Sequence, residues 1–186
     1  MNDFLISLQD VQNYLFKQGY NAPTNINSDT NLQLLREAAY DRIKKYLGYD
    51  FISASYTDEY YNGNSKSLIY VRHRPITSLN TVKINDSEYD VDGFDVVEDG
   101  NVIYYKDGYF PYSINNIKLS YQAGWTRTSM PPSIRLVALK LCSLWYKQQG
   151  VEGMTSQSNQ DGTSYSYDFS EDDVLGVIYN FKAMSW

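Results

Sequence analysis

Residues 71–85, VRHRPITSLNTVKIN, contain two features on which the fold assignment depends: a proline that interrupts the strand pattern, and an alternation of apolar and polar residues. Pro75 has no backbone N–H to donate to a strand ladder, so we expect a strand to end there and Ile76 to turn the chain inward. Farther on, Val82 and Ile84 alternate with polar residues, which predicts a half-buried strand with these two side chains on the core face.

The same stretch holds His73, the only imidazole in the chain, between Arg72 and Arg74. Neighbouring cations oppose protonation of an imidazole, so we expect His73 to be neutral and structural. The sequence has no second histidine for a metal cluster and no G-x-S-x-G motif for a serine nucleophile. We therefore interpret the stretch as architecture and predict no catalytic, metal or cofactor-binding residues.

Short, tyrosine-rich and β-branched segments surround this stretch from residue 51 to residue 125. Turn signals such as Asn62-Gly63 and Asp99-Gly100 separate them, which is typical of hairpins. The patterns predict an antiparallel layer with strands at 56–61, 67–72, 81–84, 88–91, 102–105 and 117–121.

Helical patterns flank the β-rich region on both sides. Ser7 is placed to cap a first helix, and a second helix is expected to start after Ser28 or Asp29 and to end at Gly48. Pro131-Pro132 opens the most apolar helix, and Ser170 begins the last one. The predicted class is α+β: a small helical bundle with two N-terminal helices, one long central helix and one C-terminal helix, into which an antiparallel β-hairpin layer is inserted.

We expect one domain over residues 1–186, divided by composition into five segments. These are a helical part (1–50), a β-rich insertion (51–125), the core helix (131–149), a mobile loop (150–164), and a C-terminal arm with a helix (163–186). In the arm, Tyr165, Tyr167 and Phe169 alternate with polar residues. This pattern predicts a strand that stands alone and can add to the sheet edge of a partner.

Composition argues against several functions. The formal net charge of −6 opposes specific binding to nucleic acid. Cys142 is the only cysteine and lies in an apolar helical run, so we expect it to be buried and no intramolecular disulfide to form. No apolar run approaches the length of a membrane span, and the first ten residues do not resemble a signal peptide, so we expect a soluble cytoplasmic protein.

The order of several short motifs resembles that of the head–tail connector proteins of tailed bacteriophages, also called adaptor or head-completion proteins. The motifs are IKKYLG at 43–48, RPI at 74–76, LSYQAG at 119–124, PPSI at 131–134 and SYSY at 164–167. The resemblance covers the chain from about residue 8 to residue 181. It is carried by the order and spacing of apolar motifs, and none of them performs a reaction.

The resemblance implies a structural virion protein that forms a ring of twelve copies beneath the portal protein and above a tail-proximal stopper or tail-completion protein. DNA would pass along the axis without specific binding, and assembly would take place in the host cytoplasm. Arg72 and Arg74 are the expected contacts to an acidic neighbouring subunit. Tyr165, Tyr167 and Phe169 are the expected contacts of the docking arm.

Two other functions stay open from the residues alone. The 19 tyrosines and 3 tryptophans suit a carbohydrate- or protein-binding surface module of a virion. The acidic residues allow a small hydrolase, which would need two carboxylates about 5 to 10 Å apart across a cleft. The candidates are Asp58, Glu59, Asp95, Glu98, Asp99 and those at 171–173.

Overall fold

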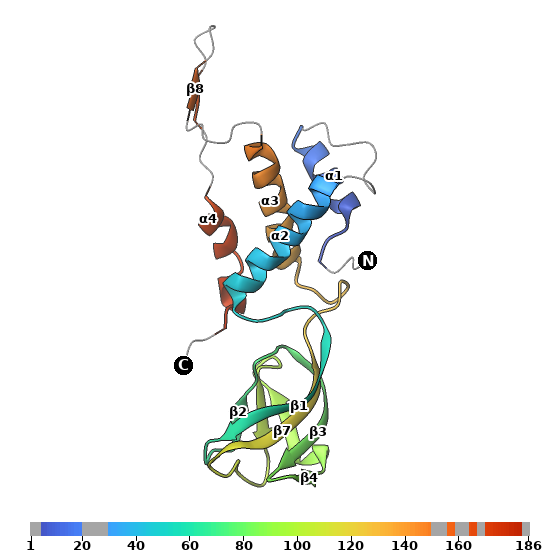
Figure 1. Ribbon diagram of the computed structural model, residues 1–186, viewed down its shortest axis with the longest axis vertical. Helices are drawn as coiled ribbons and strands as arrows, with labels where there is room; N and C mark the ends of the chain where they lie inside the picture. Colours follow the sequence, from blue (N-terminus) through green and yellow to red (C-terminus); the bar gives the residue numbers. More distant parts are fainter. Residues whose placement is uncertain (1–4, 20–29, 150–155, 159–163, 167–169, 184–186) are drawn as a thin grey trace. The chain divides into compact units, whose positions relative to one another are not determined.

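The computed structural model describes residues 5–19, 30–149, 156–158, 164–166 and 170–183. The chain forms two compact units: a helical unit within residues 1–48 and 130–186, and a β unit within residues 49–129 (Figure 1). The β unit is thus inserted between two parts of the helical unit. This arrangement confirms the α+β class expected from the sequence.

The helical unit contains α1 (Leu8–Lys17), α2 (Thr30–Leu47), α3 (Pro132–Gln148) and α4 (Glu171–Gly176), followed by the 3₁₀ turn η3 (Tyr179–Phe181). Helices α2 and α3 pack against each other, α1 packs on both, and α4 packs on α3. The apolar side chains between them recur at helical spacing, so each helix buries one stripe. Residues fully enclosed there include Leu15, Leu32, Ile43, Ile134, Leu141 and Cys142.

Two of the predicted helix ends are confirmed in atomic detail. Ser7 Oγ accepts a hydrogen bond from the Asp10 backbone N–H (3.0 Å), and Asp10 Oδ2 accepts one from the Ser7 N–H (2.8 Å). This reciprocal pair satisfies two N–H groups at the start of α1. Helix α2 ends before Gly48, whose φ of +84° is the left-handed conformation that favours glycine. The expected caps Ser28 and Asp29 lie outside the described residues.

The last helix is shorter than the sequence pattern indicated. It ends at Gly176; Leu175 within it and Ile178 just beyond it are buried, whereas Val177 is 49% exposed. Glycine is a poor helix former, and here the chain continues as a 3₁₀ turn that rotates the following side chains.

The β unit consists of two antiparallel sheets that enclose one core. The first has the order β1-β7-β3-β4, and the second has the order β2-β6-β5. The strands are β1 (Ala54–Gly63), β2 (Leu68–Tyr70), β3 (Ile76–Ile84), β4 (Ser87–Tyr89), β5 (Phe94–Val97), β6 (Val102–Tyr105) and β7 (Ser113–Ala123). All but β5 were predicted. Strand β5, which directly follows a 3₁₀ turn at Val91–Gly93, was missed.

The structure corrects the expectation that a strand ends at Pro75: β2 ends earlier, at Tyr70, and Pro75 directly precedes β3. The peptide bond between Arg74 and Pro75 is cis, and β3 begins at Ile76 with a buried side chain. Val82 and Ile84 lie in the core of the β unit, as their alternation predicted. Strand β1 pairs with β7, whose partner residues lie 50 to 69 positions away in sequence, so this sheet depends on long-range pairing.

The expectation of a lone strand in the C-terminal arm is corrected. Ser164–Ser166 forms strand β9, but it pairs antiparallel with β8, Ser156–Ser158, which lies in the segment expected to be a loop. A run of serine and glutamine contains little signal for a strand, so only the pairing reveals β8. Among the described residues, no third strand pairs with this hairpin.

Candidate partner-contact site

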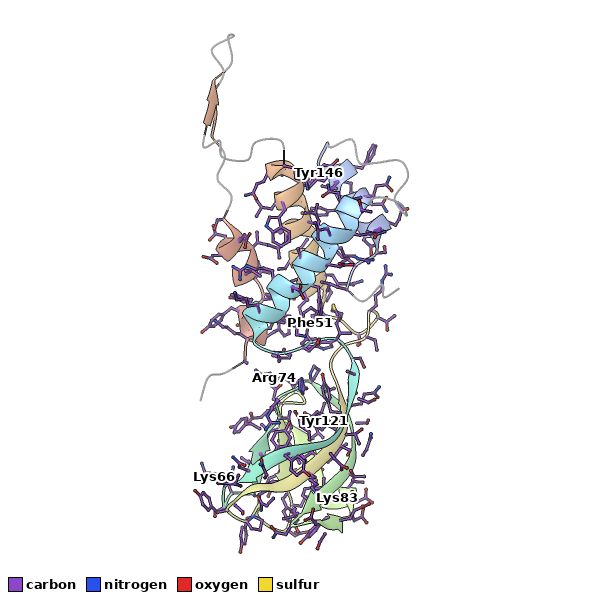
Figure 2. All side chains as sticks on the ribbon, in the orientation of Figure 1. Phe51, Lys66, Arg74, Lys83, Tyr121 and Tyr146 are labelled. Carbon is purple, nitrogen blue, oxygen red and sulfur yellow. The ribbon has the colours of Figure 1, made fainter. Side chains whose placement is uncertain are left out.

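A buried polar cluster forms where β1 and β7 face the core of the β unit. Glu59 Oε2 accepts hydrogen bonds from the phenols of Tyr61 (2.6 Å) and Tyr121, and the two phenol oxygens lie 2.8 Å apart. Tyr121 is completely buried, and the Glu59 side chain is 16% exposed. Figure 2 shows Tyr121 within the sheets of this unit. The cluster therefore holds a carboxylate in the core with its oxygens satisfied.

Arg72 closes this cluster on its solvent side. Its Nη1 lies 3.1 Å from Glu59 Oε1, its Nη2 donates to the Tyr60 carbonyl (2.7 Å), and its guanidinium lies 4.6 Å from the centre of the Tyr61 ring. Its backbone N–H donates to the Tyr61 hydroxyl (3.0 Å). Arg72 thus connects the end of β2 to the edge strand β1 through several donors, which a planar guanidinium is suited to do.

His73 belongs to the same cluster. Its ring stacks on Tyr56 with the centroids 3.8 Å apart and the planes at 7°. Its Nε2 lies 3.5 Å from Glu59 Oε1, so a protonated His73 would pair with that carboxylate. A stacked imidazole facing a carboxylate that is already bonded to two phenols and a guanidinium is a packing element, in agreement with the structural role expected for it.

The surroundings set the ionisation of the cluster. Burial acts to raise the pKa of Glu59, but the hydrogen bonds from Tyr121, Tyr61 and Arg72 outweigh it, so the pKa lies below its usual value. Burial, reinforced by the hydrogen bonds to Glu59, raises the pKa of Tyr121, and burial is also the main cause of the raised pKa of Tyr61. The stable arrangement is one charged carboxylate with two neutral phenols.

The second expected contact residue, Arg74, lies in the β unit as well. Its guanidinium is 4.8 Å from the centre of the Tyr49 ring. Burial raises the pKa of Tyr49 to about 12, and the charge of Arg74 opposes this rise. Both arginines therefore have partners within their own unit, and the Arg72 side chain is still 58% exposed.

The expected contact residues of the arm are only partly described. Tyr165 lies in the middle of β9, opposite Gln157 of β8. Tyr167 and Phe169 lie outside the described residues. The β8–β9 hairpin belongs to the helical unit, and the two arginines belong to the β unit.

The sequence did not indicate that Glu59 lies at the centre of the polar cluster. The sequence places Glu59 among several solvated acids, and it places Tyr61 and Tyr121 on strands. The spacing of Glu59 and Tyr61 by two residues indicates a shared sheet face, but nothing local indicates that Tyr121 joins them. A β-bulge at Asp58, with φ of +50°, helps to turn Glu59 onto the core face.

Two of the other candidate carboxylates, Asp95 and Glu171, have ordinary ion-pair partners. Asp95 pairs with Lys106 (3.0 Å), and Glu171 pairs with Arg42 (2.8 Å). Among the described residues there is no group of three or more His, Cys, Asp and Glu side chains that could hold a metal ion. Likewise, none of the helices in the described part of the chain has the length and apolar character needed to cross a membrane.

A helical unit into which a two-sheet β unit is inserted defines the α+β class of this chain. Chains of similar fold occur in the neck of an empty gene transfer agent particle computed with C6 symmetry (11% identity, 98% of this chain and 91% of that chain, TM-score 0.57) and in the virion of a native gene transfer agent particle (10% identity, the same coverage, TM-score 0.56). No curated protein sequence matches the chain.

The family assignment comes from the sequence itself. The family model for head completion proteins matches residues 4–172, which is most of the chain. The chain therefore belongs to the head completion protein family. Its role is structural, in the head–tail region of a virion, as the motif order indicated.

Proposed function

We propose that the chain assembles into a closed ring that joins the portal of a phage head to the tail and acts without catalysis. The observation that carries this proposal is the match of the head completion family over residues 4–172. A chain of similar fold belongs to a neck computed with C6 symmetry, which supports a ring built from a multiple of six copies. Twelve copies is the number that the motif resemblance implied.

DNA passes along the axis of the proposed ring without being gripped. The chain is acidic, with 22 Asp and Glu against 16 Lys and Arg. An acidic channel wall repels phosphates, so it favours sliding over specific binding. We therefore predict that the purified protein binds duplex DNA no more tightly than an unrelated acidic protein at physiological salt.

The β8–β9 hairpin is the proposed docking arm toward the portal or the tail-proximal protein. A two-stranded hairpin is marginally stable by itself, whereas an added strand from a partner satisfies its open edge. Tyr165, Tyr167 and Phe169 would supply the side-chain contacts. Replacing residues 156–166 by a Gly-Ser linker of equal length should abolish co-migration with the portal and leave the unfolding midpoint of the protein unchanged.

Arg72 and Arg74 are proposed to reach acidic groups of the neighbouring copy. More than half of the Arg72 side chain remains exposed although it is bonded within its own unit, so a second partner has access to it. Reversal of Arg74 to Glu should weaken assembly. Since Arg74 also contacts Tyr49, the control is Arg74→Gln, which removes the charge without introducing repulsion and should have a smaller effect.

The test of the whole proposal is native mass by light scattering, for the protein alone and mixed with its cognate portal. A ring in either sample is the expected result. A monomer that stays separate from the portal at micromolar concentration would refute the proposal. Glycan binding lost on single Tyr→Ala changes would then support the surface-module alternative.

A further inference from the structure

The connection between β6 and β7, together with the first residues of β7, exposes three large apolar side chains to solvent. Tyr109, Tyr112 and Ile114 are 62%, 82% and 79% exposed, and all lie within residues 109–114, which we call the knuckle. The knuckle contains no charged residue. Single exposed apolar residues are ordinary, but a cluster of this kind on a small β unit marks an interaction surface.

The backbone beneath the knuckle is firmly held. Phe110, between the exposed residues, is fully buried and packs near Phe94 and Tyr105. Its N–H donates to the Lys66 carbonyl (2.9 Å), and its carbonyl accepts from the Ser65 N–H (2.9 Å). An apolar contact on a fixed backbone loses little entropy on binding, which favours affinity.

A second set of bonds holds the C-terminal half of the knuckle. Asn116 donates from Nδ2 to the Pro111 carbonyl (2.9 Å) and accepts from the Gly63 N–H (2.9 Å). The Asn115 N–H donates to Asn62 Oδ1 (2.8 Å). Tyrosine and isoleucine presented in this way are typical of the anchors of protein interfaces.

The helical unit of the same chain carries a complementary surface. An open hollow of about 450 Å³ lies along the first turns of α2 and is lined by Thr30, Asn31, Gln33, Leu34 and Glu37. Leu34 is 64% exposed, and Glu37 is exposed as well. The hollow is shallow and open to solvent, and all of its lining residues belong to α2, so it suits side chains that rest on the helix surface.

The charged residues beside the two surfaces have opposite signs. Lys66, which is exposed and bonded through its backbone to Phe110, stands beside the knuckle; Figure 2 labels it at one end of the β unit. Glu37 stands at the hollow. A knuckle seated in the hollow of another copy would therefore bring an apolar centre to Leu34 and a cation to an anion at the rim.

We propose that, in the ring, the knuckle of one copy docks into the α2 hollow of the next copy. This inference rests on the proposed ring, because a contact between two different surfaces of the same chain repeats from copy to copy and gives a ring when the rotation closes. Tyr112 is the central anchor, Tyr109 and Ile114 flank it, and Leu34 is the apolar floor that receives them.

The test is disulfide cross-linking of the full chain carrying Tyr112→Cys and Leu34→Cys. Both native side chains are exposed, so neither change disturbs a core. Cys142 can remain, because it is fully buried and burial raises the pKa of its thiol to about 12. Mild oxidation should give a denaturing-gel ladder that extends beyond dimers, whereas Tyr112→Cys alone can give no more than dimers.

The matched control joins Tyr112→Cys with Lys45→Cys. Lys45 is exposed and lies eleven residues from Leu34 on the same face of α2, about 16 Å farther along the helix. A ladder from the variant with Leu34→Cys, and none from the variant with Lys45→Cys, is the expected result. Equal ladders from both pairs would mean random collision and would overturn the inference.

Native mass of the same samples, with and without portal, separates the two proposals. A ring that forms while the variant with Leu34→Cys gives no ladder would overturn the knuckle contact and leave the ring standing, with the knuckle then facing another virion protein. Absence of a ring in both samples would overturn both. As a further readout, Tyr112→Ser should raise the protein concentration needed for half-assembly about tenfold.

Discussion

Tyr121, in the middle of β7, donates a hydrogen bond from its phenol to the carboxylate of Glu59 in β1. The two residues are 62 positions apart in sequence, and Tyr121 is completely buried. Their bond lies on the core face of the sheet, where Tyr61 and Arg72 complete the shell around the carboxylate. A charge held in this way ties the edge strand β1 to the centre of the β unit.

Replacement of Glu59 by Gln should lower the free energy of unfolding by about 2–3 kcal/mol, because charge-assisted bonds to two phenols and a guanidinium are lost in a buried site. Urea unfolding followed by circular dichroism measures this. The control is Asp86→Asn, which removes an exposed carboxylate bonded to Lys118 and should change stability little. Equal effects of the two changes would contradict the role assigned to Glu59.

Stability should fall in acid. The folded pKa of Glu59 is lower than its ordinary value of 4.5, so its contribution is fully present above that value and is lost as the pH falls through the folded pKa. The urea midpoint should therefore be level from about pH 7 to pH 5 and decline below that. In Glu59→Gln the decline should be shallower, with part of the remainder due to Glu171, whose pKa is also lowered, by the hydrogen bond from Arg42 first and that from Trp145 second.

Stability should also fall in alkali. Burial raises the pKa of Tyr61 and Tyr121 above the ordinary 10.0, so the neutral phenols stabilise the fold below that pH and this contribution is lost as the pH rises. Unfolding midpoints above about pH 10 should drop less steeply in Tyr121→Phe than in the natural protein. The absorbance of phenolate in the folded protein should show a late-titrating group of tyrosines, and complete titration near pH 10 would contradict this.

Gly63 should not tolerate a side chain. A Cβ built there would lie 1.7 Å from the Pro111 carbonyl oxygen, so Gly63→Ala must displace the backbone that supports the knuckle. We expect a loss of about 2–3 kcal/mol in the free energy of unfolding. Gly93→Ala is the matched control, because a Cβ there meets nothing within 4 Å, and its effect should stay within about 0.5 kcal/mol.

Glu171 should hold α4 against the bundle. Its carboxylate accepts from Arg42 Nε (2.8 Å) and from Trp145 Nε1 (2.8 Å), on α2 and α3 respectively. Because the Glu171 side chain is 35% exposed, Glu171→Ala should cost only about 1 kcal/mol. More sensitive measurements of this change are amide hydrogen exchange, which should be faster in α4 of Glu171→Ala, and tryptophan fluorescence, which should shift. Asp172→Ala, which removes a 93% exposed partner 3.7 Å from Arg42, should show neither.

The elements of the fold were largely predictable because their signals are local. The capping pair Ser7 and Asp10, the stop at Gly48 and the alternation of Val82 and Ile84 each span only a few residues. Strand β8 escaped prediction because it consists of serine and glutamine, and its partner β9 supplies the only reason for it to be a strand. The short α4 escaped because apolar spacing continues past Gly176 although the helix does not.

The candidate site, like the fold, was only partly predictable from the sequence. The sequence drew attention to Arg72, His73 and Arg74, but it did not indicate that the first two surround Glu59. Their meeting depends on the bulge at Asp58, which changes the register between β1 and β7. A shift of one residue would turn Glu59 to the other face of the sheet, and no local pattern specifies such a shift.

By itself, the sequence determined the α+β class, the helix boundaries at its capping residues, most strands and membership of the head completion family. These follow from periodicity, turn chemistry and motif order, which are properties of neighbouring residues. The tertiary structure alone decided that the β region forms two sheets around one core, that a carboxylate is buried among tyrosines, and that the knuckle stands exposed on a fixed backbone. Each of these depends on pairing across tens of residues, where packing and register rather than local preference select the partner.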